Sequence, residues 1–238
     1  MSHTLPPISE MDRAYFNRYS GGYSPYTADD LRLLLDDLLE AMRGLPSPRI
    51  CEVGSADGQF SRELARRLPE TPFLLGFDIA EGVLRLYPFH KLVASAFQIP
   101  AANESLDVVC YAAALHHLAP FALSLREMNR VLAPGGLAYF LEPNFFHPQR
   151  RFLMSRPALY RRYRPANDTP VNPETLRRAL SEQGIEVLHL RYITLHFKSP
   201  GVLQGMQNAI ARLPWPARLA RYVHPWFVMI ARKNPAHA

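Results

Sequence analysis

Residues 49–68 read RICEVGSADGQFSRELARRL, and this stretch decides the fold. The run RICEV (49–53) is short and apolar, as in a buried strand, whereas QFSRELARRL (59–68) has the periodicity of a helix. Gly54 and Gly58 bracket the turn between them, where the backbone can approach a ligand closely because glycine has no side chain. A turn that opens a helix also presents unpaired backbone N–H groups. The stretch therefore predicts a strand, a ligand-binding turn and a helix.

The alternation of strand and helix continues on both sides of this stretch. Upstream, TADDLRLLLDDLLEAM (27–42) repeats leucines at intervals of three and four, which predicts an amphipathic helix with Thr27 as its N-cap. Downstream, we predict helices at 81–87, 121–132 and 173–183, and strands at 73–77, 91–94, 106–111, 136–142, 185–193 and 226–232. This order predicts an α/β fold, with a mostly parallel sheet and helices on both faces.

An acidic residue, Asp78, closes the second predicted strand 20 residues after Gly58. A carboxylate at that distance can accept hydrogen bonds from ribose hydroxyls, as in dinucleotide-binding folds. The dehydrogenase pattern G-x-G-x-x-G is absent, because Ala56 and Gln59 stand where it needs glycine. The phosphate-binding loop G-x-x-x-x-G-K-S/T is absent too, because no lysine precedes Lys91. These residues leave open which nucleotide binds.

Four segments resemble, in order, the motifs of the class I S-adenosylmethionine-dependent methyltransferases, particularly the small-molecule group often called type 11. They are EVGSADG (52–58), FDIA (77–80), FQIPAANESLDVVCYAAALHHL (97–118) and REMNRVLAPGG (126–136). The resemblance implies S-adenosyl-L-methionine as the cofactor and an enzyme that methylates an O, N or C nucleophile of a small metabolite. It also implies a Rossmann-like sheet of seven strands in the order 3-2-1-4-5-7-6, with strand 7 antiparallel.

The resemblance further implies which residues contact the cofactor. Asp78 would bind the ribose, and Ile79 and Phe97 would enclose the adenine, although core packing explains these two apolar residues nearly as well. The whole implied set is Glu52, Gly54, Ser55, Ala56, Gly58, Asp78, Ile79, Ser95, Ala96, Phe97, Tyr111 and Ala112. The chain departs from the family at Ala56, the family's middle glycine, and at Ser95, where the adenine loop commonly has an acid. Both departures predict weaker cofactor binding.

The candidates for catalysis follow the fourth and fifth predicted strands. The resemblance places the methyl donor beside Tyr111, with the backbone of Ala112 at the amino acid end of the cofactor. His116 or His117 would accept a substrate proton near neutral pH; alternatively, the pair positions the cofactor. Glu142 would orient the acceptor or accept its proton. We expect no metal, because no Cys or His pair stands at ligand spacing.

The charge of the chain divides near residue 144. Residues 1–144 carry 12 basic and 17 acidic side chains, a net charge of −5, whereas residues 145–238 carry 15 and 4, a net charge of +11. We predict one domain over 1–238, made of an N-terminal cap and helix (1–48), a cofactor-binding half (49–144) and substrate-side insertions (145–171 and 194–224). The basic excess predicts an anionic or lipid-linked acceptor.

Arginines and apolar residues are interleaved in both insertions. RRFLMSRPALYRRYR (150–164) contains six arginines, and the apolar segment 201–222 contains three. Such segments predict contact with a membrane surface. The alternative is a solvated basic surface, since 24 of the 27 basic residues are arginine. At the other end, the tyrosine-rich YFNRYSGGYSPY (15–26) would close over the cofactor, as in the family, or pack as a surface arm.

Several other classes of protein are not expected. The amino-methylating nucleic-acid enzymes of this fold carry Asp/Asn-Pro-Pro-aromatic after the fourth strand, where this chain has YAAAL (111–115). No apolar run approaches the roughly 20 residues that cross a bilayer, and no signal peptide opens the chain. Cys51 and Cys110 fit buried thiols of a cytoplasmic protein. Two alternatives stay open: a non-catalytic binding or scaffold protein of this fold, and a methyltransferase held peripherally at the inner membrane face.

Overall fold

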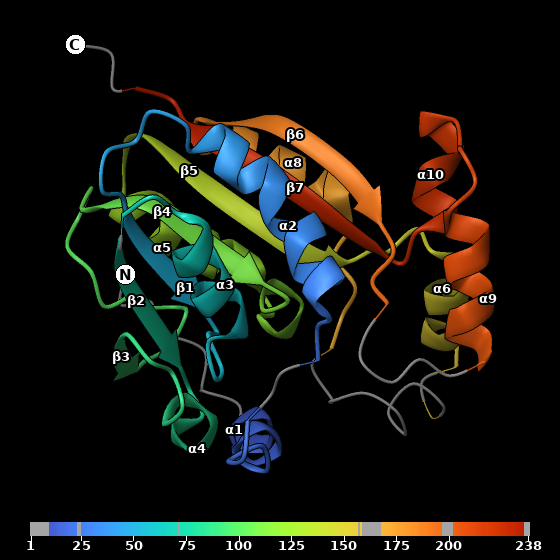
Figure 1. Ribbon diagram of the computed structural model, residues 1–238, viewed down its shortest axis with the longest axis horizontal. Coiled ribbons are helices and arrows are strands. Elements are labelled where there is room, and N and C mark those ends of the chain that lie inside the picture. The colour runs from blue at the N-terminus through green and yellow to red at the C-terminus, as the bar shows by residue number, and fades with distance from the viewer. Residues whose placement is uncertain are drawn as a thin grey trace.

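The computed structural model describes residues 10–22, 25–70, 72–156, 158, 168–196 and 202–235. Its centre is one seven-stranded sheet in the order β3-β2-β1-β4-β5-β7-β6 (Figure 1). The strands are β1 (Arg49–Val53), β2 (Phe73–Asp78), β3 (His90–Val93), β4 (Leu106–Ala112), β5 (Leu132–Pro143), β6 (Ile185–Ile193) and β7 (Trp226–Lys233). β7 is antiparallel to both β5 and β6, and the other neighbours pair in parallel. The predicted order and directions are confirmed.

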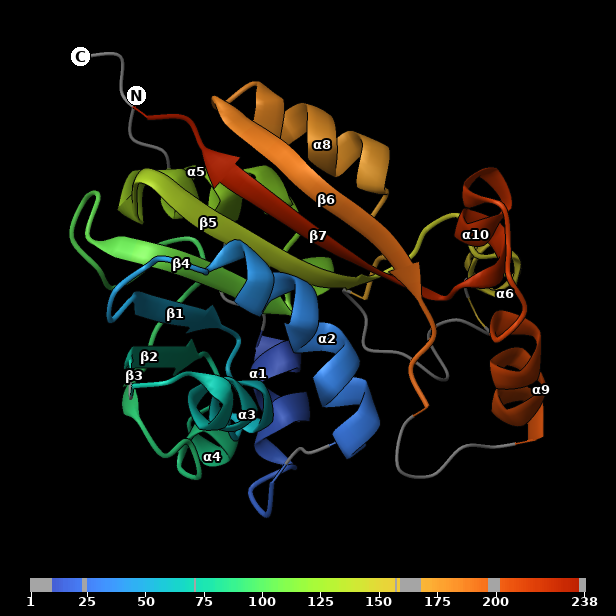
Figure 2. The ribbon, with the colours of Figure 1, turned by 45° about the horizontal axis from the view of Figure 1, so that its top comes forward.

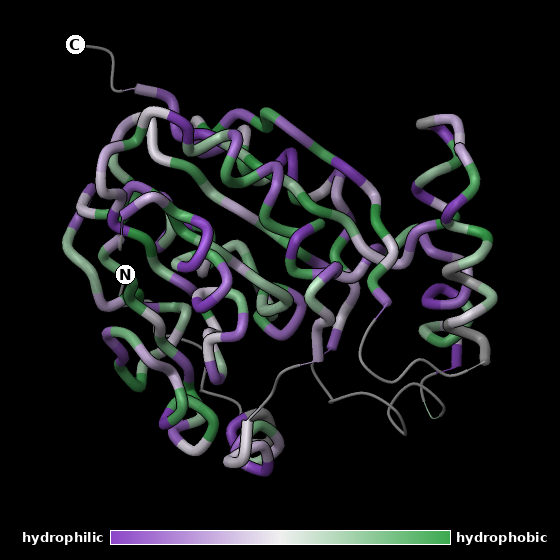
Figure 3. The backbone as a smooth tube through the Cα atoms, viewed as in Figure 1, coloured by the Kyte–Doolittle hydropathy of each residue, from purple (hydrophilic) through white to green (hydrophobic). Residues whose placement is uncertain are grey.

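Helices cover both faces of the sheet, as predicted. They are α1 (Glu10–Asn17), α2 (Ala28–Ala41), α3 (Gln59–Arg67), α4 (Glu81–Leu84), α5 (Phe121–Val131), α6 (Pro148–Met154), α8 (Pro173–Ser181), α9 (Val202–Ala211), α10 (Ala217–Val223) and the 3-10 helix η1 (Leu115–His117). α2 and α3 bury residues such as Leu34 and Phe60 on one face, and α5 and α8 bury Leu125 and Leu176 on the other (Figure 2). Apolar and polar residues alternate along these helices (Figure 3), because each has one side toward the sheet.

Two helices begin at the residues that the sequence indicates. The Thr27 hydroxyl accepts the Asp30 N–H at 3.1 Å, and the Asp30 carboxylate accepts the Thr27 N–H at 2.9 Å, which completes a capping box for α2. The Asn172 side chain accepts the Glu174 N–H at 2.9 Å, with Pro173 as the first residue of α8. Both starts therefore follow from local side-chain chemistry.

Two boundaries differ by three or more residues from the predictions, and one helix was not predicted. α4 ends at Leu84 instead of 87, because Pro88 disfavours a helical conformation of the residue before it. β5 begins at Leu132 instead of 136, because Leu132 already pairs with Leu106 before the ladder continues at Leu137. The eight-residue helix α1 was not predicted at all.

The second half of the chain adds a separate layer of helices. α6, α9 and α10 lie together beyond the end of the sheet where β5 and β6 finish and β7 begins (Figures 1 and 2). We call these three helices the helical lobe. They come from the segments expected as insertions, whose residues 157, 159–167 and 197–201 lie outside the described part of the chain. None of the helices in the described ranges has the length and apolar character needed to cross a membrane.

Candidate cofactor and active site

The candidate residues gather where β1, β2, β4 and β5 end, which is the crevice side of an open α/β sheet. The strand order reverses between β1 and β4, and ligands of such sheets bind at this switch point. The N–H groups of Gly54 and Ser55 donate to the Phe77 carbonyl at 2.9 and 3.1 Å. The turn after β1 is thereby fixed against the end of β2.

Asp78 joins this turn to the residues that follow β2. One carboxylate oxygen accepts the Ala56 N–H at 3.1 Å, and the other accepts the Ala80 N–H at 2.9 Å. Burial raises the pKa of Asp78 above its ordinary value, and the two backbone donors oppose that rise. The carboxylate is only partly buried, and each oxygen keeps a second lone pair. Asp78 can therefore hold the turn and still accept ribose hydroxyls.

Ala56 occupies a backbone conformation that favours glycine. Its φ is +45°, and Gly54 and Gly58 on either side have φ of +66° and +81°. A left-handed conformation costs a residue with a Cβ roughly 1–2 kcal/mol. The turn thus keeps the shape of a three-glycine motif although its middle residue is alanine, with Asp78 bonded to the backbone at this position.

Glu52 lies beneath the turn and not in the crevice. Its carboxyl accepts the hydroxyl of Ser61 on α3, which in turn lies 2.9 Å from the Tyr87 hydroxyl. Only 3% of Glu52 is exposed, and this burial raises its pKa to about 8. The neighbouring Ser55 hydroxyl is also buried, and no described residue hydrogen-bonds to it. In this structure the Glu52 side chain therefore supports the turn from below, and its contact with the cofactor stays a prediction.

Tyr87 is a site residue that sequence reasoning missed. Its ring fills the space beside Gly58 and Gly76, where a Cβ on Gly76 would stand 2.4 Å from the ring. The signal for it was a glycine inside the apolar strand FLLGFD (73–78), since glycine in a strand often marks a close approach.

The predicted adenine loop begins directly beside Asp78. The Ala94 N–H donates to the Asp78 carbonyl at 3.1 Å, and the Ser95 hydroxyl accepts the Phe97 N–H at 3.2 Å. Ser95 and Phe97 are partly buried, as is Ile79 across the crevice edge, whereas Ala96 is buried. The three partly buried side chains retain exposed surface that a ligand can contact.

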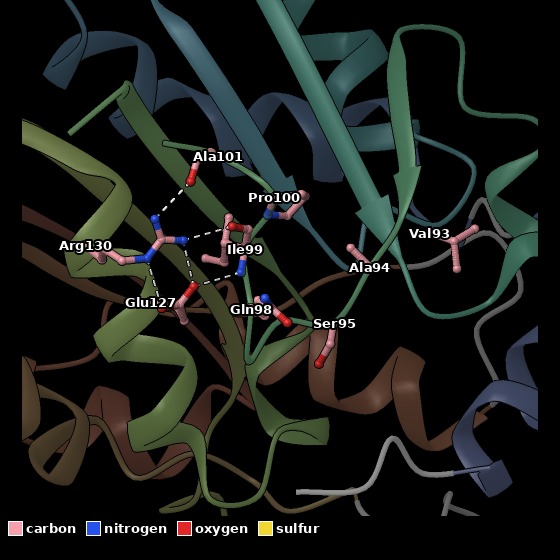
Figure 4. Close-up of a pocket in the computed structure, with 9 residues that line it drawn as sticks. All are labelled: Val93, Ala94, Ser95, Gln98, Ile99, Pro100, Ala101, Glu127 and Arg130. Atoms are coloured by element: carbon pink, nitrogen blue, oxygen red, sulfur yellow. Dashed lines mark hydrogen bonds and ion pairs between the residues drawn. The ribbon is translucent and has the colours of Figure 1, made fainter. Parts of the chain in front are cut away.

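Two charged residues of α5 clamp this loop, and sequence reasoning missed their role. Glu127 accepts the Ile99 N–H at 3.0 Å, while Arg130 donates to the carbonyls of Ile99 and Ala101 at 2.9 Å each. Arg130 also pairs with Glu127 at 2.8 Å (Figure 4). The pair and loop line a pocket of about 640 Å³ that includes Ser95 (Figure 4). The Glu-x-x-Arg spacing, which puts both side chains on one helix face, was the available signal.

Tyr111 belongs to the core and not to the crevice. Its side chain is fully buried, and its hydroxyl lies 2.8 Å from the Ser124 hydroxyl on α5. The side chain faces α5 because alternate strand residues face opposite sides of a sheet, and the place of Tyr111 beside the methyl donor stays a prediction. Its neighbour Ala112 keeps exposed surface at the strand end, where its backbone remains a candidate contact.

Glu142 organises the segment after β4. It is completely buried and accepts the N–H groups of Ala114, Leu115 and His116 at 3.2, 2.7 and 3.2 Å. Its Oε2 also lies 2.7 Å from Nδ1 of His116. Burial raises the pKa of Glu142 to about 8, against the effect of the backbone donors. No part of Glu142 is exposed in this structure, where it positions His116; its role toward the acceptor stays a prediction.

His117 is the last residue of η1 and lies next to the N-terminal helix α1. The rings of His116 and His117 are 4.0 Å apart, and Phe16 of α1 meets the His117 ring edge-on at 5.3 Å. α1 is held in turn by Asn17, whose side chain accepts the Gly82 N–H at 2.9 Å. His117 is partly exposed, whereas His116 is buried. The two histidines, expected as equivalent candidates, therefore have different environments.

The N-terminal tyrosines do not form one cluster among the described residues. The Tyr15 and Tyr19 hydroxyls are 3.3 Å apart near α1, and Tyr26 is buried against the α2 side of the sheet. Tyr23 lies outside the described residues. α1 packs against α4, the helix that follows β2, and its closure over the cofactor stays a prediction. Among the described residues no group of three or more His, Cys, Asp or Glu is arranged to hold a metal ion.

Comparison with known proteins assigns the part of the chain that contains this candidate site to a family. Residues 51–140 match the family model described as "Methyltransferase domain". This part of the chain is a class I methyltransferase domain. It contains β1 to β4 and most of β5, and so includes the turn after β1, Asp78 and both histidines.

Named relatives resemble this methyltransferase domain over part of their length. A malonyl-[acyl-carrier protein] O-methyltransferase of Methylococcus capsulatus is 33% identical over 115 residues, 44% of this chain and 42% of that protein. A 2-phytyl-1,4-naphtoquinone methyltransferase of Thermosynechococcus vestitus is 31% identical over 121 residues, 48% of this chain and 52% of that protein. The chain thus spans about half the length of the curated relatives it matches.

A solved structure shares the fold over nearly the whole chain. An S-adenosylmethionine-dependent methyltransferase from Archaeoglobus fulgidus superposes with a TM-score of 0.62 at 16% identity, covering 92% of this chain and 99% of the other. The helices and strands outside residues 51–140 therefore also belong to a methyltransferase-like fold.

The cofactor of the methyltransferase domain is S-adenosyl-L-methionine, and the described residues fit it. A ribose needs acceptors for its hydroxyls, which the Asp78 carboxylate offers. An adenine needs a partly apolar slot, which the exposed surfaces of Ile79 and Phe97 can form. In the turn after β1, Gly54 and Ala56 are left-handed and partly exposed, so their backbone is accessible to the amino acid end.

Proposed function

We propose that this protein transfers the methyl group of S-adenosyl-L-methionine to an oxygen, nitrogen or carbon nucleophile of a small acceptor. The observation that carries the proposal is the junction at Asp78. Its side chain bonds the turn after β1, while its backbone carbonyl bonds the start of the loop after β3. The Asp78 carboxylate, which would accept hydrogen bonds from the ribose hydroxyls, thus lies between the candidate sites for the adenine and for the amino acid end of the cofactor.

The residues of the chain would contribute mainly alignment. S-adenosyl-L-methionine, when bound, supplies a methyl group already activated on a sulfonium, so that placing the nucleophile in line provides most of the acceleration. Glu142 fixes the backbone of η1 and the ring of His116. His117, partly exposed and next to Phe16 of α1, is the candidate to accept a proton from the acceptor. α1 would exclude water from this part of the crevice.

We propose further that the acceptor is anionic or linked to a lipid. The lobe beside the crevice is rich in arginine, and residues 145–167 and 187–238 contain no Asp or Glu. The two relatives named above act, by their names, on a malonyl group of an acyl-carrier protein and on a phytyl-bearing naphtoquinone. Both substrates support an acceptor of this class, carried by a larger anionic or apolar group.

Transfer of labelled methyl groups tests the proposal. The protein is incubated with cell extract and S-adenosylmethionine radiolabelled in its methyl group, and the products are separated by solvent extraction and by anion exchange. We expect label in a small product that enters the organic phase or binds the anion exchanger, and much less label with the Asp78→Ala variant. A protein that binds the cofactor yet labels no small product would instead be a non-catalytic binding or scaffold protein of this fold.

A further inference from the structure

The helical lobe exposes apolar side chains that a folded protein normally buries. Met206 and Ile210 lie four residues apart on α9, and hence on one face of that helix, with 59% and 47% of their surfaces exposed. Leu213, just beyond the helix end, is 58% exposed. On α10, Leu219 and Tyr222 are spaced by three and are 46% and 40% exposed. Neighbouring exposed apolar residues of this kind mark an interaction surface.

Exposed arginines belong to the same lobe, and none of its three helices contains an Asp or Glu. Arg151 and Arg156 on the α6 side and Arg212 and Arg218 on the other side are exposed. Arg156 also stacks over the exposed Phe152 ring, with 3.9 Å between the guanidinium carbon and the ring centroid. Outside the lobe, Glu174 pairs with Arg221 at 3.0 Å and neutralises that arginine alone.

The exposed apolar side chains and the exposed arginines together favour one kind of partner for this surface. A second copy that packed lobe against lobe would bring arginines against arginines, which repel. An acidic soluble protein would pair with the arginines but would not require the exposed apolar side chains. An anionic bilayer satisfies both features, because apolar side chains enter the boundary of the acyl chains while arginines reach the lipid phosphates.

The lobe is also fixed next to the candidate active site. The Asn144 side chain donates to the carbonyls of Arg221 and His224 at 2.7 and 2.8 Å, which ties α10 and its end to the end of β5. Two residues earlier, Glu142 holds the segment that carries both histidines. A surface bound by the lobe would therefore lie beside the crevice.

We propose that the helical lobe docks this protein on an anionic lipid bilayer. Met206, Ile210 and Leu213 enter the interface, and Arg212 and Arg218 bind the headgroups. The inference goes beyond methyl transfer, because docking depends on the outer surface of the lobe and not on the cofactor site.

Sedimentation of the full chain with lipid vesicles tests the docking. Vesicles are made of phosphatidylcholine alone or of phosphatidylcholine mixed with phosphatidylglycerol, and no cofactor is added. We expect binding to the mixed vesicles that weakens as salt is raised. The double variant Arg212→Gln/Arg218→Gln should bind about 30-fold more weakly, since each arginine near an anionic surface contributes about fivefold. The triple variant Met206→Ser/Ile210→Ser/Leu213→Ser should also lose most of its binding.

A matched control removes exposed apolar residues elsewhere. Leu45 and Leu92 are 36% and 49% exposed and lie outside the lobe. The double variant Leu45→Ser/Leu92→Ser should bind vesicles like the unaltered protein. Circular dichroism and urea unfolding of every variant would exclude loss of the fold as the cause of weaker binding.

Three results would overturn the docking proposal. In the first, the unaltered protein sediments no more with mixed vesicles than with phosphatidylcholine. In the second, the arginine variant loses binding while the serine variant keeps it, which contradicts the entry of Met206, Ile210 and Leu213 into the interface and leaves attraction by charge alone. In the third, the chain self-associates through Met206, Ile210 and Leu213 without binding lipid. None of these results bears on methyl transfer, which is measured separately.

Discussion

The buried carboxyl of Glu52 should make the stability of the folded protein depend on pH. Its folded pKa of about 8 exceeds the ordinary value of 4.5, so the folded protein binds a proton that the unfolded chain releases between those values. Stability is therefore greatest at low pH within this window and falls as the pH rises from about 5 to about 9, by at most about 1.4 kcal/mol per pH unit for one group. Urea unfolding across this range should show the fall.

The variant Glu52→Gln separates this contribution from that of Glu142, whose pKa is raised in the same direction. Glutamine keeps a hydrogen-bonding partner for Ser61 but does not titrate. We expect a shallower dependence of the unfolding free energy on pH, with part of the slope remaining from Glu142. An unchanged slope would mean that Glu52 does not hold a proton in the folded state.

The two neighbouring histidines should respond differently to replacement. If His117 accepts the proton of the acceptor, His117→Ala lowers kcat by about 100-fold or more, because general base catalysis contributes on that order. The Kd for the cofactor, measured by calorimetry, should stay nearly unchanged. His116→Ala should instead lower the urea midpoint, since His116 is buried against Glu142. An unchanged kcat for His117→Ala would limit the pair to positioning.

At the scale of elements, side chains of α5 hold the predicted adenine loop, which follows β3. Arg130 donates to the carbonyls of Ile99 and Ala101 in this loop, and Glu127 accepts the Ile99 N–H. Arg130→Ala should raise the Kd for S-adenosylmethionine about tenfold, on the order of one to two lost hydrogen bonds, while kcat changes less. Arg126→Ala, an exposed arginine on the same helix, is the matched control. Equal Kd values for both variants would show that the loop keeps its shape without the clamp.

Element boundaries were predictable where local chemistry defines them. The strands at 49–53 and 185–193 have the bounds predicted for them, because each is an apolar run next to proline or glycine. The same sequence could not show the partners of Glu142, which come from backbone 26 to 28 residues earlier in the chain. It showed that Tyr111 lies in a strand but not which face it points to. The sequence therefore could not indicate the contacts of Glu142 and Tyr111, which depend on residues distant in the chain.

At the scale of the whole molecule, the charge division corresponds to the architecture. The acidic part up to residue 144 contains the strands of the methyltransferase domain, and the basic part supplies α8, β6, β7 and the helical lobe. Both parts share one sheet, because β7 inserts between β5 and β6. The basic residues thus lie on an extension of the same sheet, at its end beside the crevice.

Titration calorimetry with S-adenosylmethionine tests the central claim, that the edge around Asp78 is the cofactor site. The unaltered protein should bind one equivalent saturably, and Asp78→Ala should weaken binding by about 10- to 100-fold, the effect of losing hydrogen bonds to a charged group. Asp29→Asn, which alters a highly exposed carboxylate on α2, is the control and should bind normally. No heat of binding by the unaltered protein up to millimolar cofactor, or equal affinity for the Asp78 variant, would contradict the claim.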